Sequence, residues 1–355
     1  KKRKFMSKFS FSLLPSVDIK ESINLAVTCE KNNFEAIWVA DEIWYRDPWP
    51  IMAICSTATR KIKIGPGVTH IFLRNPAFVA QSLATLDEIS NGRSICGLSI
   101  GNEIMLQQFK VNSKNRINIL REAVLIIKSL LNGQVLDFNG TQFQYKGVSI
   151  NTKTVQKRIP IYLAGKVGPK AFELAGEVGN GAILSDVYTQ DWARKIVKIL
   201  RNSYNNAKRK DFNKNFDIAT WILMGIHEDE EIARKLVKPL VTFYLPMQFP
   251  KQLENLGVPL EIYHNVSDLL KNGKIKEAME IVDDDIINKL SITGTPSQIS
   301  ERLYKLDKEG IRHFVVAPAD NPTLINLGLK DYVVNGALDL SSSLKLINKK
   351  IISNF

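Results

Sequence analysis

Two carboxylates, two aromatic rings and a guanidinium follow one another in a short segment of the chain. They belong to Asp41, Glu42, Trp44, Tyr45 and Arg46. Aromatic rings can pack against a flat ring ligand, and carboxylates can accept hydrogen bonds from its polar edge. The alternative interpretation is a charged loop in which an aspartate caps the next helix. Spacing alone leaves both interpretations open.

A second candidate segment places a proline between two glycines, in the run Gly65-Pro66-Gly67-Val68-Thr69. These residues allow a sharply irregular backbone, and irregular backbone is often found at functional sites. The alternative is an ordinary turn. His70 follows directly, and a single histidine of this kind is more often a surface or hydrogen-bonded residue than a catalytic base.

Two more segments carry polar or phosphate-binding potential. In Gly101-Asn102-Glu103 an amide and a carboxylate could orient a substrate or shuttle a proton, or Asn102 could only cap the next helix. In the run from Gly165 to Gly168 a glycine-containing turn opens a helix, where free N–H groups and the helix dipole favour a phosphate. The alternative is that this turn only connects a strand to a helix.

These segments lie where short β-rich runs give way to helical runs, an alternation that continues almost to the end of the chain. It predicts an α/β fold, a (β/α)8 TIM barrel, in which chemistry sits at the carboxyl ends of the strands. A doubly wound sheet is the competing architecture, but no Gly-x-Gly-x-x-Gly follows the first strand. The predicted strands are Lys8–Leu14, Ala36–Ala40, Ile62–Ile64, Ser94–Ile100, Ile159–Leu163, Gly181–Leu184, Phe216–Ile226 and Arg312–Val316.

The pattern becomes purely helical between about residues 228 and 290, which is too long for one connection. It predicts a helical insertion before the last strand. No Ser-, Gly- or Pro-rich linker interrupts the chain, so residues 1–355 are expected to form a single domain with a basic N-terminal tail at 1–7.

Composition narrows the possible partners. The net charge of +12 favours an anionic ligand, but the positive residues are spread along the chain, so no nucleic acid partner is expected. Cys29, Cys55 and Cys96 are far apart and match neither a disulfide framework nor a metal site, which fits a reducing cytoplasm. The sequence contains no apparent signal peptide and no apolar run of about 20 residues, so no membrane association is expected.

The chain shows no metal-ligand cluster, no Ser/His/Asp arrangement and no Walker loop. From the residues alone, the prediction is therefore a barrel that binds a phosphate-bearing, flat-ring ligand.

Several ordered blocks resemble the bacterial-luciferase-like superfamily, and specifically its branch of F420-dependent methylenetetrahydromethanopterin reductases. The resemblance covers nearly the whole chain, and the block Val282-Asp283-Asp284-Asp285 looks particular to the reductase branch. The other blocks are Trp38-Val39-Ala40-Asp41-Glu42, Gly65–Thr69 with Arg74-Asn75-Pro76, Ala84–Ser90 with Gly92-Arg93, Gly168-Pro169-Lys170 with Glu173–Gly176, and Gly294-Thr295-Pro296.

The resemblance implies a coenzyme F420 lying across the barrel mouth, with a non-prolyl cis peptide at Gly67-Val68 against its central ring. It implies that the cofactor phosphate meets the turn at Gly165–Gly168. It also implies a homodimer or a higher homo-oligomer. The cofactor-binding residues implied are Gly67, Val68, Thr69, Gly101, Ala164, Gly165, Val167 and Gly168. The catalytic candidates are Asp41, Glu42, Asn102 and Glu103, and the substrate candidates are Ser12, Trp44 and Arg46.

Three positions depart from the pattern of the reductases. Ser12 stands where they tend to have an acidic residue, Asp41-Glu42 replaces their Asp-His, and Asn102 stands where they have another acid, unless Glu103 takes its place. Each departure changes the charge of the position or its ability to exchange a proton. The resemblance therefore indicates the cofactor more strongly than the substrate.

The leading hypothesis is hydride transfer from reduced coenzyme F420 to 5,10-methylenetetrahydromethanopterin, a soluble small molecule. An F420-dependent dehydrogenase of an alcohol or sugar phosphate is an alternative. A luciferase-like monooxygenase that uses FMN and oxygen is another, and a non-catalytic cofactor-binding protein is a third.

Overall fold

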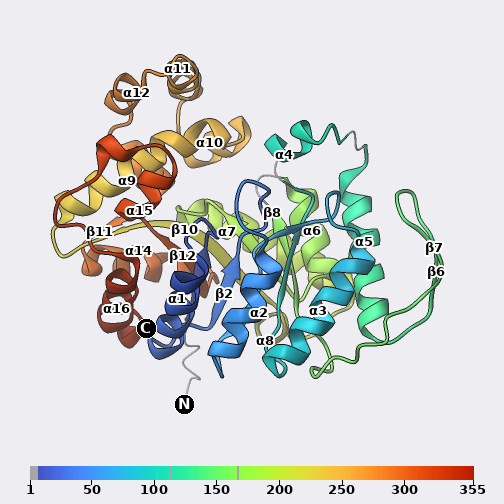
Figure 1. Ribbon diagram of the computed structural model, residues 1–355. Coiled ribbons are helices and arrows are strands. Elements are labelled where there is room, and N and C mark those ends of the chain that lie inside the picture. Colours follow the sequence, from blue (N-terminus) through green and yellow to red (C-terminus); the bar gives the residue numbers. More distant parts are fainter. Residues whose placement is uncertain (1–6, 102, 112–113, 166–167) are drawn as a thin grey trace. The chain divides into compact units, whose positions relative to one another are not determined.

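The chain forms two compact units, which the computed structural model describes over residues 7–101, 103–111, 114–165 and 168–355 (Figure 1). The N-terminal unit consists of Ser10–Ile183 and Ile199–Ile218. The C-terminal unit consists of Leu184–Lys198 and Ala219–Phe355, together with the residues before Ser10.

The main strands of the N-terminal unit are short, parallel and mostly buried. In one set β1 pairs with β2 and β2 with β3, so that Phe11 lies opposite Ile37 and Ile37 opposite Ile64. In a second set β4 pairs with β5 and β5 with β8. Parallel strands are usually buried on both faces, and β2, with the sequence Ala36-Ile37-Trp38-Val39, is accordingly apolar and buried at every position. The strands are β1 (Lys8–Leu13), β2 (Ala36–Val39), β3 (Lys63–Pro66), β4 (Thr69–His70), β5 (Cys96–Ser99), β8 (Ile161–Gly165) and the first part of β9 (Gly181–Ser185).

Several helices of this unit, α1, α2 and α3 among them, begin at a side-chain cap. The Asp47 side chain accepts the N–H of Trp49 at the start of α2, and the Asn75 side chain accepts the N–H of Ala77 at the start of α3. Each of these two caps is followed directly by a proline, which has no N–H to lose. The helices are α1 (Ile19–Lys31), α2 (Pro48–Ala58), α3 (Pro76–Ser90), α4 (Glu103–Gln108), α5 (Arg116–Leu131), α6 (Pro169–Val178), part of α7 (Gln190–Asn206) and α8 (Phe212–Asn215).

An antiparallel hairpin of β6 (Leu136–Asn139) and β7 (Gln144–Val148) follows α5. Its turn is held by the Glu122 carboxylate, which accepts the backbone N–H groups of Thr141, Gln142 and Phe143. These hydrogen bonds lower the pKa of Glu122, although its partial burial acts in the opposite direction. The hairpin was not predicted, although Leu136-Asp137-Phe138-Asn139 alternates apolar and polar residues; its strands are only four and five residues long and lie half-exposed.

The C-terminal unit combines a few parallel strands with many helices. Strand β10 (Asp217–Ile226) pairs in parallel with both β11 (Ile292–Gly294) and β12 (His313–Pro318). The predicted insertion is confirmed, since helices fill the chain from Glu230 to Leu290. The helices are α9 (Glu230–Tyr244), η1 (Leu245–Met247), α10 (Pro250–Leu256), α11 (Leu260–Lys271), α12 (Ile275–Ile281), α13 (Asp284–Leu290), α14 (Pro296–Lys308), α15 (Asn321–Asn326), η2 (Lys330–Tyr332), α16 (Leu340–Lys350) and η3 (Ile352–Asn354).

Each of the eight predicted strands has a counterpart in the structure, in β1, β2, β3, β5, β8, β9, β10 and β12. The short strands β4 and β11 were not predicted, because segments of two or three residues are too short to show a period. In the described part of the chain no helix is both long and apolar enough to cross a membrane.

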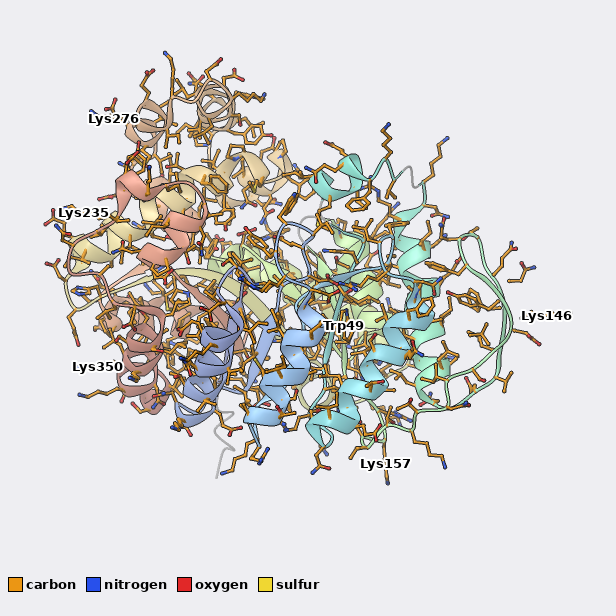
Figure 2. The ribbon with its side chains drawn as sticks, in the orientation of Figure 1. Trp49, Lys146, Lys157, Lys235, Lys276 and Lys350 are labelled. Carbon is orange, nitrogen blue, oxygen red and sulfur yellow. The ribbon has the colours of Figure 1, made fainter. Side chains whose placement is uncertain are left out.

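Lysines project from the surfaces of both units (Figure 2). Those labelled there are all exposed, with Lys146 on the hairpin, Lys276 on α12 and Lys350 on α16. The positive charge is thus distributed over several elements.

Candidate functional site

The Asp41 carboxylate, which follows β2, is only 6% exposed and lies at the centre of a polar network in the N-terminal unit. Its Oδ2 accepts hydrogen bonds from Thr69 Oγ1 at 2.7 Å and from Arg74 Nε at 2.6 Å, and its Oδ1 accepts from Arg74 Nη2 at 2.9 Å. Both oxygens are therefore engaged. Burial lowers the pKa of Arg74, but the hydrogen bonds and charge of Asp41 outweigh it, so the net shift is upward.

His70 extends this network toward β5. Its Nε2 lies 2.7 Å from the Asp41 carbonyl oxygen, and its Nδ1 lies 3.2 Å from Ser99 Oγ. Because a carbonyl can only accept, Nε2 carries the proton and Nδ1 accepts from the serine hydroxyl. Ser99 Oγ in turn accepts the backbone N–H of Gly101 at 3.1 Å. Burial lowers the pKa of His70, although the nearby Asp41 opposes this, so the net effect of its surroundings favours the neutral ring.

The peptide bond between Gly67 and Val68 is cis, as predicted, and it separates β3 from β4. The N–H of Gly67 donates to the Val39 carbonyl at 2.8 Å. A Cβ on Gly67 would lie 2.5 Å from Trp38 Cβ, so only glycine fits against this buried ring. Gly67 and Val68 are half-buried. Thr69 is fully buried, and its hydroxyl donates to Asp41 Oδ2.

The turn after β8 provides a helix start without a side-chain cap. Ala164 and Gly165 end β8 and are half-buried, and Gly168 is the N-cap residue of α6 with no side-chain hydrogen bond. A Cβ on Gly168 would meet no described atom within 4 Å, so this position faces open space. Lys166 and Val167, which the sequence also placed here, lie outside the described residues.

The family of the chain follows from its similarity to known proteins. The family model for luciferase-like monooxygenases matches residues 6–313. The chain belongs to the luciferase-like monooxygenase family.

Relatives of this luciferase-like chain include a 5,10-methylenetetrahydromethanopterin reductase from Archaeoglobus fulgidus. It is 28% identical over 349 residues, which cover 97% of this chain and 98% of the relative.

Solved structures show the same fold. A coenzyme F420-dependent tetrahydromethanopterin reductase from Methanopyrus kandleri superposes with a TM-score of 0.88 at 23% identity, covering 99% of each chain. An F420-dependent secondary alcohol dehydrogenase in complex with an F420-acetone adduct superposes with a TM-score of 0.77 at 18% identity, covering 98% of each. The (β/α)8 barrel is thereby confirmed, and the doubly wound sheet is excluded.

The remaining predicted residues of this luciferase-like chain occupy varied environments. Ser12 is half-buried in β1, opposite Trp38 in register, and Trp44 is 45% exposed. Arg46 Nη1 donates to the carbonyls of Ser16 at 2.9 Å and Val17 at 2.8 Å, so it fastens the loop after β1. The assignment of these three residues to the substrate remains a prediction.

Two catalytic candidates fall on or beside undescribed positions. Asn102 lies outside the described residues, and Glu103 begins α4 with a side chain that is likewise not described. Glu42 is half-buried directly after Asp41, and the phenol of Tyr45 has a raised pKa because of burial and the charge of Glu42.

Sequence reasoning assigned no role to Arg74 or Ser99, although both complete the Asp41 network. Arg74 stands directly before Asn75-Pro76, a helix-start signal that places it at the same strand edge as Asp41. Its other signal was its place in the Arg74-Asn75-Pro76 block of the family resemblance, because Arg74 and Asp41 are far apart in the chain.

The three cysteines are buried and unpaired. Burial raises the pKa of Cys55 to about 11 and that of Cys96 to about 12, so neither is a ready thiolate. Within the described ranges, no three side chains of His, Cys, Asp or Glu come together as a metal site would require.

Proposed function

We propose that the chain is a coenzyme F420-dependent oxidoreductase that transfers a hydride between the deazaflavin and a soluble small molecule, 5,10-methylenetetrahydromethanopterin. The observation that carries this proposal is the end-to-end match to a reductase of that name. A match over the whole length of both chains includes the strand ends, the loops and the helical insertion together. The structural neighbours that depend on F420 add support at the level of the fold.

The residues present fit such a cofactor. The half-buried Gly67-Val68 segment and the Asp41 network lie at strand ends, where a barrel binds its ligands. The uncapped start of α6 at Gly168, next to open space, offers backbone N–H groups for a phosphate. Gly67, Val68, Thr69, Gly101, Ala164, Gly165, Val167 and Gly168 would hold the cofactor.

When bound, coenzyme F420 supplies hydride chemistry, and the protein supplies orientation and protons. The methylene carbon of the substrate receives the hydride, one of its C–N bonds breaks, and the released nitrogen takes up a proton. Asp41 positions Thr69 and Arg74, because both of its oxygens accept their hydrogen bonds. Glu42 and Glu103 are the proposed proton donors, and Asn102, Ser12, Trp44 and Arg46 are proposed to orient the substrate.

The proposal is tested by mixing the purified protein with reduced F420 and methylenetetrahydromethanopterin and following the return of oxidised deazaflavin absorbance. The expected result is turnover that depends on both compounds. Glu42→Gln is expected to lower kcat by about 10²-fold with little change in F420 affinity, because only a proton donor is lost.

Other outcomes would replace this proposal. Turnover of an alcohol or sugar phosphate with oxidised F420, and none with the pterin, would indicate a dehydrogenase like the second structural neighbour. Tight FMN binding with oxygen uptake would indicate a monooxygenase, as the family's description suggests. F420 binding without any turnover would indicate a non-catalytic cofactor-binding protein.

We further propose that the enzyme acts in the cytoplasm as a homodimer or higher homo-oligomer, without nucleic acid. The buried, unpaired cysteines support a reducing compartment, and the dispersed lysines argue against a nucleic-acid surface. Light scattering coupled to size exclusion tests the oligomeric state. A monomer at micromolar concentration would contradict it.

A further inference from the structure

A cavity of about 470 Å³ lies within the C-terminal unit, and among the described residues its lining shares none with the site proposed above. Its walls come from β11, α9, α14, the end of α13 and the segment after β9. The residues that matter here are Thr293 on β11, Arg302 on α14, Arg234 on α9 and Asn288 on α13.

Three hydrogen-bond donors around this cavity are buried without an acceptor in the described structure. They are Thr293 Oγ1, Arg302 Nη1 and Arg234 Nη1. Thr293 is 3% exposed, so its hydroxyl has little access to bulk water. Arg234 Nη1 lies 3.6 Å from Asp284 Oδ1, too far for a good hydrogen bond. Buried donors are nearly always satisfied in folded proteins, so three around one cavity call for an acceptor.

Of the cationic side chains that line the cavity, all but Arg302 form an ion pair within the described chain. Arg234 pairs with Glu230 at 2.7 Å, Lys289 with Asp285 at 2.6 Å and Lys305 with Glu301 at 2.7 Å. Arg302 Nη2 donates to the Asn288 carbonyl at 2.5 Å, but in the described chain no carboxylate lies within ion-pair distance of Arg302.

A guanidinium held in this way is costly. Burial lowers the pKa of Arg302, the positive charge of Arg234 lowers it further, and the nearby Tyr188 only partly opposes them. Arg302 as a residue is half-buried, but its Nη1 is fully buried, and a charged group buried without a counter-charge destabilises a fold unless something compensates it. An anion with several acceptor oxygens would supply both the counter-charge and the hydrogen-bond acceptors.

We propose that this cavity is a binding site for the phosphate group of a small molecule, held by Arg302, Arg234 and the Thr293 hydroxyl. The planar fork of arginine matches the oxygens of a phosphate, and charge-assisted bonds of this kind are the strong ones. The cavity volume falls in the range of small-molecule sites, so it has room for the group that carries the phosphate. The site is separate from the proposed reductase chemistry and does not rest on it.

The test is calorimetric titration of the full chain with inorganic phosphate and with glycerol 3-phosphate, against chloride at matched ionic strength. The wild type is expected to bind both phosphates saturably, and tighter binding of glycerol 3-phosphate would identify an organic phosphate as the ligand. Tighter binding of inorganic phosphate would identify the free ion. The assay contains neither deazaflavin nor pterin, so its outcome is independent of the reductase assay.

Two variants and a matched control locate the binding. Arg302→Met is expected to weaken phosphate binding at least tenfold, and Thr293→Val, which keeps the side-chain shape, about threefold or more. Arg194→Met is the control, since Arg194 is an exposed arginine of the same unit that pairs with Glu309 outside the cavity. It is expected to leave binding unchanged.

The proposal is overturned if the wild type binds phosphate no better than chloride, or if Thr293→Val and Arg302→Met both bind as the wild type does. Should Arg302→Met fail to fold, the Thr293→Val result alone decides, because that variant changes neither charge nor volume appreciably.

Discussion

Asp41, Thr69 and Arg74 form an ion pair and hydrogen-bond group that ties the end of β2 to the loop before α3. Asp41 is buried, whereas Arg74 is about one-third exposed, with 32% side-chain exposure. The contribution of this ion pair to stability is therefore expected to lie between those of fully buried and of surface ion pairs. Removing one partner leaves the charge of the other without a counter-charge. The resulting loss of stability is usually larger than the stability that the intact pair contributes.

Asp41→Asn is accordingly expected to lower the free energy of unfolding by about 2–3 kcal/mol, because the amide cannot pair with the Arg74 guanidinium. Urea unfolding measures this. The matched control is Asp47→Asn, since Asp47 contacts the same Arg74 at 3.3 Å but is 53% exposed. The control should cost less than about 1 kcal/mol. Equal losses in the two variants would contradict the argument.

His70 predicts a pH dependence. Burial lowers its folded-state pKa below the unfolded value of about 6.5, so the unfolded chain binds the proton first as pH falls. Stability from the neutral ring is thus present above about pH 6.5 and is lost as pH falls through the folded-state pKa. Asp41 and Arg74 are the charged groups beside the ring.

His70→Gln keeps a donor for the Asp41 carbonyl but cannot titrate. Between roughly pH 7.5 and pH 5 the wild type is expected to lose more Tm than this variant. Thermal melts in matched buffers provide the measurement. Parallel pH profiles for the two proteins would rule His70 out as the titrating group.

At the scale of elements, the bend between β3 and β4 depends on close backbone approach. A Cβ on Gly65 would lie 1.9 Å from the Ile95 carbonyl oxygen, and backbone atoms cannot move aside as a flexible side chain can. Ile64 bridges to Ser94 in the neighbouring chain segment, so these strands are fixed against each other.

Gly65→Ala is therefore expected to cost about 3 kcal/mol or more, or to prevent folding. Gly168→Ala is the stability control, because its Cβ meets open space and its φ is −97°. The control should cost less than about 1 kcal/mol. Circular dichroism with urea unfolding compares the two, and a Gly65→Ala protein as stable as the wild type would contradict the packing argument.

At the scale of the whole molecule, the net charge of +12 is spread over exposed lysines of both units. A distributed positive field attracts an anionic cofactor without forming a discrete patch, and salt screens such a field. Raising KCl from roughly 50 mM to about 500 mM is expected to weaken F420 binding several-fold. Fluorescence titration of F420 measures the affinity, and an affinity independent of salt would show that only local contacts matter.

We also propose that residues 1–355 fold as a single domain. The strands β1, β9 and β10 and the helix α7 each contain residues of both compact units, so no linker separates the units along the chain. Calorimetry is expected to give one cooperative unfolding transition. Two resolved transitions in the absence of ligand would contradict a single domain.

Much of the fold could be predicted from the sequence because its signals are local. Short β-rich runs located eight of the strands that the structure contains, and α3 begins at Pro76, directly after the Asn75 cap. The hairpin β6–β7 carries a local signal in its alternating Leu136–Asn139 run followed by Gly140, but the contact of its turn with the Glu122 carboxylate of an earlier helix could not be predicted. A contact between distant residues leaves no periodic pattern.

The sequence by itself determined the class of fold, the strand ends that carry the polar residues and an irregular backbone within Gly65–Thr69, and the family resemblance implied its position at Gly67-Val68. Only the tertiary structure decided that Asp41 is engaged by Thr69 and Arg74, that His70 bridges Asp41 to Ser99, and that Arg302 Nη1 is buried without an acceptor among the described residues. The reason is physical. Secondary structure follows from short-range sterics and periodicity, whereas the partner of a charged group depends on which distant segment the folded chain brings beside it.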